Sequence, residues 1–208
     1  MTKVEKSVIK TLAFFDIISR PLTLEEILRF LYQDSASRLQ ILMALKKLKR
    51  ANLIIEKKDQ DLIDQTRRKE TYFAFSSRER MITNYFQNQF LQKKKWAKIN
   101  WVIKLLERLP FVEHISVINS TSFRTAKEES DIDILLIAHK NHLWTARALV
   151  VFVLELLGQN KNKWYKKDKF CLGFAFDKDR LNLKNLRLKK DIYFSYWLAN
   201  IVPVFDRG

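Results

Sequence analysis

The stretch ISVINSTSFRTAKEESDIDILLI, residues 115–137, gives the strongest indication of how the second half of this chain folds. It opens with the β-prone run 115–118, passes through a polar loop, and ends in the apolar run 131–137, which carries two acids near its start. Short apolar runs bounded by polar loops are typical of buried strands. Because alternate residues of a strand point to the same face, we expect Asp131 and Asp133 to lie side by side, about 7 Å apart along the strand.

Two carboxylates on one face of an otherwise apolar strand indicate a cation site. Buried acids are costly unless a metal or a base pairs with them. Carboxylate oxygens are hard ligands, so we expect Mg²⁺ or Mn²⁺ rather than Zn²⁺, with Asp131 and Asp133 as metal ligands and catalytic acids. A metal held in this way bridges triphosphate oxygens in phosphoryl or nucleotidyl transfer. The alternative is a pair of acids that caps the strand or lies on the surface.

Upstream of this stretch, residues 1–77 are predicted to form a winged helix-turn-helix. Apolar residues at helical spacing over 8–18 give a first helix, and capping boxes at Thr23 and Ser37 begin a second and a third. Two β-prone runs, 53–56 and 71–75, then predict a hairpin. The inner positions expected for the third helix are Leu39, Leu42, Met43, Leu45 and Leu48.

The basic residues of this domain suggest contact with DNA or RNA. In a winged helix the third helix can enter a major groove while the wing touches the flanking backbone. The candidates on the third helix and the wing are Arg38, Lys46, Lys47, Arg50, Arg67 and Arg68. The alternative is that the domain contacts a protein partner and that these side chains serve solubility.

Residues 78–110 are predicted to be helical and to link this domain to a second one over 111–208. The basic run 93–98 in the linking segment is interpreted as a solvated face, with a nucleic-acid-binding stripe as the alternative. A helix over 142–157, a strand over 170–176 and a helix over 191–201 complete the second domain. The fold class is therefore α+β.

Composition limits the classes of protein that this chain can belong to. Only three of the 208 residues are glycine, which excludes the G-x-G-x-x-G and G-x-x-x-x-G-K-[ST] phosphate loops. The net charge of +16 favours a polyanionic partner such as a nucleotide or nucleic acid. Cys171, the only cysteine, is expected to be a buried, unreactive thiol in a reducing compartment. With no apolar leader and no long apolar run, we expect a cytoplasmic protein without membrane contact.

The strand, Asn119-Ser120, polar loop and Asp131-x-Asp133 strand together resemble the signature of the DNA polymerase β-like nucleotidyltransferase superfamily. In that signature a strand is followed by Gly-Ser and then by an acid-x-acid strand. The phrases 21–23, 143–147, 167–172 and 196–203 are similar to a bacterial and archaeal group with a winged helix ahead of the transferase domain. The resemblance implies a small mixed sheet with helices, a divalent cation on Asp131 and Asp133, and a nucleoside triphosphate as substrate. The residues that it places at the nucleotide are Asn119, Ser120, Ser122 and Arg124.

Two departures from the signature leave two functions open. Asn119 stands where the family has glycine, and no acid lies in the middle of the strand 170–176, where a third acid is expected. One hypothesis is an enzyme that transfers a nucleotidyl group from a nucleoside triphosphate to a hydroxyl acceptor. The other is a catalytically inactive nucleotidyltransferase fold that binds nucleic acid or forms a complex with another protein.

Overall fold

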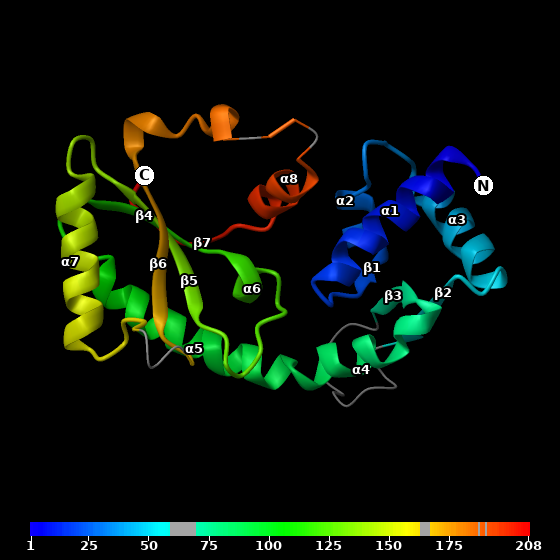
Figure 1. Ribbon diagram of the computed structural model, residues 1–208, viewed down its shortest axis with the longest axis horizontal. Coiled ribbons are helices and arrows are strands. Elements are labelled where there is room, and N and C mark those ends of the chain that lie inside the picture. The colour runs from blue at the N-terminus through cyan, green and yellow to red at the C-terminus, as the bar shows by residue number, and fades with distance from the viewer. Residues whose placement is uncertain (59–69, 163–166, 187, 190) are drawn as a thin grey trace. The chain divides into compact units, whose positions relative to one another are not determined.

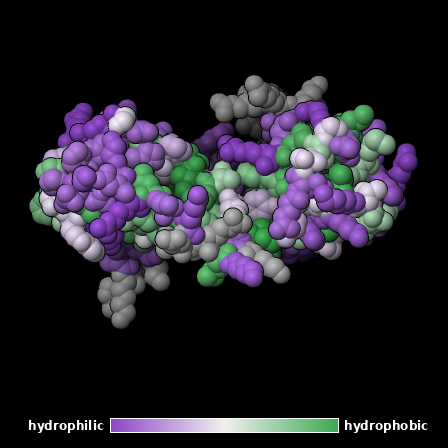
Figure 2. Space-filling model, turned by 90° about the horizontal axis from the view of Figure 1, so that it is seen from above, coloured by the Kyte–Doolittle hydropathy of each residue, from purple (hydrophilic) through white to green (hydrophobic). Residues whose placement is uncertain are grey.

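A computed structural model of the chain describes residues 1–58, 70–162, 167–186, 188–189 and 191–208 (Figure 1). The chain divides into two compact units, Met1–Gln89 and Phe90–Gly208. Each unit combines helices with one small sheet, so the expected mixed α+β class is confirmed. None of the helices within these ranges is both long enough and apolar enough to cross a membrane. Hydrophilic residues make up most of the face in Figure 2, in keeping with the high net charge.

The first unit contains three helices, a hairpin and a further helix. In chain order its elements are α1 (Lys3–Ile17), β1 (Leu22–Thr23), α2 (Leu24–Arg29), α3 (Arg38–Arg50), β2 (Ile54–Lys58), β3 (Thr71–Phe75), the 3₁₀ helix η2 (Ser76–Arg78) and α4 (Glu79–Gln87). The strands form an antiparallel sheet in the order β1-β3-β2. Both predicted capping boxes are present, at Thr23 with Glu26 and at Ser37 with Gln40. A third, at Thr2 with Glu5, begins α1.

The buried face of α3 differs from the expected one. Its buried positions are Ile41, Ala44, Leu45 and Leu48, while the predicted inner residues Leu39 and Met43 are 67% and 63% exposed. Apolar residues lie on all sides of the first turns of this helix, so composition alone does not show which side faces the core. The stripe at steps of three and four residues from Ile41 packs inward, which turns Leu39 and Met43 to the opposite side.

The predicted linking segment is two helices that belong to different units. The first, α4, ends at Gln87, and α5 (Gln89–Leu106) begins two residues later. Met81 and Ile82 of α4 pack with Ala74 of β3 in the first unit. Almost all of α5 belongs to the second unit. The segment 78–110 is thus shared between the two units.

The second unit is a four-stranded mixed sheet with helices. After α5 come β4 (Val112–Val117), α6 (Asn119–Ser122), β5 (Ile132–Ala138), α7 (Leu143–Leu156), β6 (Phe170–Asp177), the 3₁₀ helices η3 (Lys178–Arg180) and η4 (Leu183–Leu186), α8 (Ile192–Ala199) and β7 (Val202–Asp206). The strand order is β6-β5-β4-β7. Strand β4 pairs with β5 and with β7 in antiparallel orientation, and β5 pairs with β6 in parallel orientation.

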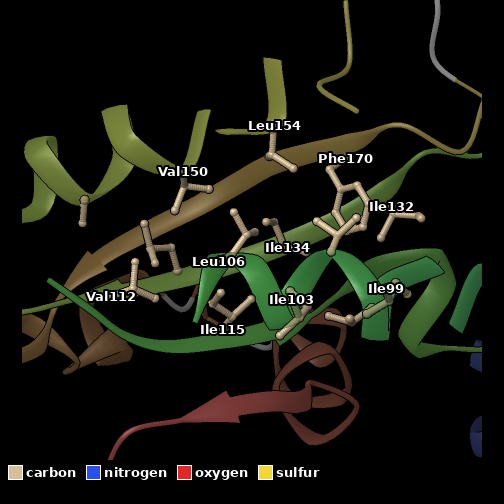
Figure 3. Close-up of a cluster of buried hydrophobic side chains, with 14 of the residues drawn as sticks. Ile99, Ile103, Leu106, Val112, Ile115, Ile132, Ile134, Val150, Leu154 and Phe170 are labelled. Carbon is tan, nitrogen blue, oxygen red and sulfur yellow. The ribbon is translucent and has the colours of Figure 1, made fainter. Parts of the chain in front are cut away.

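The core of the second unit lies between α5, α7 and one face of the sheet. Ile103 of α5, Ile134 of β5 and Val150 of α7 are among its buried side chains, and Figure 3 shows them facing one another. Because side chains alternate along a strand, the core positions Ile132 and Ile134 direct Asp133 to the opposite face. The core therefore presents this acid away from α5 and α7.

One lysine of the basic run is buried, which corrects the expectation of a solvated face. Lys95 is 1% exposed; its Nζ donates to the carbonyl oxygen of Ser130 at 2.7 Å and pairs with the carboxylate of Asp168. Lys98 Nζ donates to the carbonyl oxygen of Asp168 at 2.5 Å. These bonds attach the segments that precede β5 and β6 to α5. The two strands that carry the candidate site therefore start from anchored positions.

Candidate functional site

The turn that follows β4 begins with a residue in the left-handed conformation. Asn119 has φ of 57°, the left-handed conformation that glycine and asparagine adopt most readily. The backbone N–H of the preceding Ile118 donates to the carbonyl oxygen of Asp133 at 3.0 Å. Asn119 thus lies directly beside the acid-bearing strand, in a left-handed conformation.

Asp131 and Asp133 are brought together as the strand pattern predicted. Asp133 lies in β5 and Asp131 immediately precedes it, and both are half-buried. One ligand atom of each lies within 4.8 Å of the other and of Cys171 Sγ. The two carboxylates are therefore close enough to share one cation.

Each carboxylate has a partner from its own chain. Asn119 Nδ2 donates to Asp133 Oδ2 at 3.0 Å, and Lys161 Nζ forms an ion pair with Asp131 Oδ2. Burial raises the pKa of the Asp133 carboxyl above its ordinary value of 3.8, and the hydrogen bond from Asn119 partly opposes this effect. The neighbouring charge of Asp131 adds to the increase. A cation at this position would stabilise the charged form of Asp133.

The side chain of Asn119 joins the acid to α8. Its Oδ1 accepts a hydrogen bond from Trp197 Nε1 at 2.9 Å, and Trp197 is 6% exposed. The ring of Trp197 lies 5.2 Å from that of Phe174 on β6. The amide is therefore held in one orientation by contacts from two strands and a helix. A glycine at this position has no side chain to make these contacts.

Cys171 lies beside Asp133 on the neighbouring strand, two residues before Gly173 in the middle of β6, where no acid stands. It follows the first residue of β6, and the parallel register pairs it with Asp133 of β5. The thiol is half-buried in the site, so the expectation of an unreactive core cysteine placed it wrongly. Burial raises the pKa of this thiol, while the charge of Lys161, whose Nζ lies 3.9 Å from Sγ, opposes the increase. Aligning the run 170–175 with 132–136 as neighbouring parallel strands is the sequence signal that would have located it.

The other predicted nucleotide-binding residues lie in or just after α6 and differ in accessibility. Ser122 is buried and its Oγ donates to the carbonyl oxygen of Asn119 at 2.9 Å, so its hydroxyl stabilises the turn. The Ser120 hydroxyl is half-exposed and has no hydrogen-bond partner among the described residues. Arg124 is exposed, with φ of 59°. Ser120 and Arg124 thus remain available to a ligand.

A cavity of about 520 Å³ lies beside Cys171 and Lys161, both of which neighbour the carboxylates. Cys171 and Lys161 belong to its lining, together with Arg147 of α7. Arg147 is half-buried and makes no ion pair with any acid in the part of the chain that the structure describes. A half-buried guanidinium without an acid partner, beside a lysine, gives this cavity a positive lining that suits an anionic ligand.

The predicted nucleic-acid contacts fall into three groups. Arg38 pairs with Glu25, and Lys47 Nζ lies 2.9 Å from Glu5 Oε1. Lys46 and Arg50 are exposed and form no ion pair within the described ranges. Arg67 and Arg68 of the predicted wing lie outside the described residues.

Comparisons of the chain with models of protein families, with curated proteins and with solved structures returned no match.

Proposed function

We propose that the second unit is a polymerase β-like nucleotidyltransferase domain, and that the first is a winged helix. The domain binds a nucleoside triphosphate with a divalent cation and transfers a nucleotidyl group to a hydroxyl acceptor. The observation that carries the proposal is the proximity of Asp131 and Asp133, whose oxygens lie within 4.8 Å beside the left-handed turn at Asn119. This arrangement follows from a strand, a tight turn and an acid-x-acid strand that pair in one sheet.

The carboxylates fit the cation that the proposal requires. Asp131 and Asp133 would hold Mg²⁺ or Mn²⁺, since both ions prefer oxygen ligands. When bound, the ion offsets the charge of the triphosphate oxygens. Lys161 pairs with Asp131, so a metal ion bound there would replace the lysine ammonium.

The surrounding side chains suit the substrate. Arg147 and Lys161 line the adjoining cavity and would bind phosphate oxygens, while the Ser120 hydroxyl would donate to another. In the transfer, the acceptor hydroxyl oxygen forms a bond to the α-phosphorus, the bond to the pyrophosphate oxygen breaks, and the hydroxyl proton passes to solvent. Positioning and charge compensation are the main contributions of a protein to such a step.

The second candidate function is a catalytically inactive member of the same fold. Two features favour it: Asn119 bonds to Asp133, and Gly173 lies in the middle of β6, where the resemblance places the acid that would activate the acceptor hydroxyl. In this case the chain acts through its winged helix, with Lys46 and Arg50 as the contacts to nucleic acid, or within a protein complex.

Incubating the full chain with each nucleoside triphosphate labelled at the α-phosphate distinguishes the two candidates. The reactions contain Mg²⁺ or Mn²⁺ and RNA, protein or sugar acceptors. Transfer of the label with release of pyrophosphate, lost in the double variant Asp131→Asn, Asp133→Asn, supports the enzyme. Retained binding without transfer supports the inactive fold. The control is Glu129→Gln, which removes an exposed acid from the same loop. If wild type neither binds nor transfers any nucleotide, the enzyme is ruled out, and the inactive fold stands only if the chain binds nucleic acid or a protein partner.

A further inference from the structure

Three potential metal ligands from two adjacent strands converge in the second unit. Asp131, Asp133 and Cys171 each offer one atom, and these atoms all lie within 4.8 Å of one another. The parallel register places Cys171 opposite Asp133, and neighbouring strands of a sheet lie about 4.8 Å apart. The sheet therefore fixes the distance between thiol and carboxylate.

An independent contact shows that this cluster already holds a positive charge. Lys161 comes from the segment between α7 and β6, and its ammonium pairs with Asp131 and lies 3.9 Å from Cys171 Sγ. One cation thus contacts both an acid and the thiol of the cluster. Lys161 also lines the adjoining cavity, together with Arg147.

We infer that Asp131, Asp133 and Cys171 form a mixed oxygen and sulfur site that selects Zn²⁺ over Mg²⁺. This inference rests on the proposed cation site and changes its metal. Two carboxylates alone favour Mg²⁺ or Mn²⁺, whereas a thiolate ligand favours softer ions, and Mg²⁺ does not take sulfur. Three protein ligands leave the fourth position of a tetrahedral Zn²⁺ open to a water or a phosphate oxygen. On binding, the thiol releases its proton to solvent and Lys161 leaves Asp131.

Co²⁺ serves as the spectroscopic probe, because Zn²⁺ has no absorption of its own. A thiolate bound to Co²⁺ produces a charge-transfer band in the near ultraviolet, and Cys171 is the only cysteine, so the band has one source. We expect the band in the full wild-type chain and its loss in Cys171→Ser, which keeps both carboxylates. Equimolar Zn²⁺ removes the band, and a large excess of Mg²⁺ leaves it. Lys161→Met tightens Co²⁺ binding by about fivefold, since it removes a competing cation.

Three results would overturn the inference. They are Co²⁺ binding without the band, displacement of Co²⁺ by Mg²⁺ as readily as by Zn²⁺, and no Co²⁺ binding at all. A circular dichroism melt of Cys171→Ser checks that this variant folds. The outcome is separable from the proposed function: nucleotide binding with Mg²⁺ but no band leaves the function standing. A band without nucleotide binding leaves the metal site standing.

Discussion

The side-chain amide of Asn119 donates a hydrogen bond to the carboxylate of Asp133, with 3.0 Å between Nδ2 and Oδ2. The same amide accepts a hydrogen bond from Trp197 Nε1, so Asn119 connects the candidate metal-binding acid Asp133 to α8. The backbone at Asn119 is left-handed, and its side chain links β5 to α8. This relationship determines how the site responds to substitution.

Asn119→Gly separates the structural role of the side chain from that of the turn. Glycine accepts the left-handed backbone at φ of 57° but loses the bonds to Asp133 and Trp197. We expect a loss of about 1–2 kcal/mol in the free energy of unfolding, since each hydrogen bond contributes about 1 kcal/mol, together with tighter nucleotide binding as room opens beside Asp133.

Asn119→Ala is the matched control for this change. It loses the same bonds, and its left-handed backbone costs roughly 1 kcal/mol more than glycine. Urea unfolding followed by tryptophan fluorescence measures both variants, because all five tryptophans lie in the second unit. Equal stability of wild type and both variants would contradict the structural role of the amide.

Lys95→Met tests the buried lysine. The substitution keeps the aliphatic length but leaves the carbonyl of Ser130 and the carboxylate of Asp168 without their partner. Because Asp168 is 33% exposed, water compensates in part, and we expect a loss of roughly 2 kcal/mol. Lys104→Met, at an exposed position of the same helix, should change the free energy by less than about 0.5 kcal/mol. If urea unfolding shows that both substitutions lower the free energy of unfolding equally, Lys95 is exposed to solvent and the buried contacts do not exist.

The ion pair between Glu5 and Lys47 predicts an acid-sensitive first unit. The hydrogen bond from Lys47 holds the pKa of the Glu5 carboxyl below its ordinary value of 4.5. A depressed pKa contributes stability that is present above the ordinary value and is lost as the pH falls through the folded one. We therefore expect the melting temperature of wild type to exceed that of Glu5→Gln at pH 7, and the difference to shrink below about pH 4.5. Glutamine at this position still completes the capping box. A difference that is constant from pH 7 to pH 3 would contradict the assignment.

The exposed cations of α3 predict a salt-dependent contact with duplex DNA, if the first unit acts as proposed. Arg50→Ala should weaken binding and reduce the slope of log affinity against log salt by about 1, because one phosphate contact is lost. Lys6→Ala, which removes an exposed lysine from α1, is the control and should leave the slope unchanged. Gel shifts across a range of salt concentrations measure both. A wild-type slope near zero would show that the first unit does not contact DNA phosphates.

The strand pair and the turn of the site could be predicted because they depend on short-range patterns. Alternation along a strand places Asp131 and Asp133 together, and asparagine tolerates the left-handed turn. Lys95 could also have been found, since it continues the buried stripe of Ile99 and Val102 at helical spacing. The prediction of a solvated face gave more weight to the positive charge of Lys95 than to its position in the stripe. Its partner Asp168 is also distant in sequence.

Cys171 and Lys161 could not be placed from local pattern alone. The position of Cys171 depends on the register between β5 and β6, which are separated by α7, and an apolar run carries no register of its own. Lys161 precedes β6 in a basic segment where its pairing with Asp131 depends on the same register. The sequence therefore predicts the acids of the site and leaves the groups opposite them undetermined.

The most direct test of the central claim is calorimetric titration of the full chain with a non-hydrolysable nucleoside triphosphate. The titration is made with Mg²⁺, Mn²⁺ or Zn²⁺ and repeated with a chelator. The claim that Asp131 and Asp133 form a cation-dependent nucleotide site predicts binding with at least one of these ions. It also predicts loss of binding with the chelator and in the double variant Asp131→Asn, Asp133→Asn. Binding that persists unchanged in the chelator or in the double variant, or no binding under any condition, would contradict it.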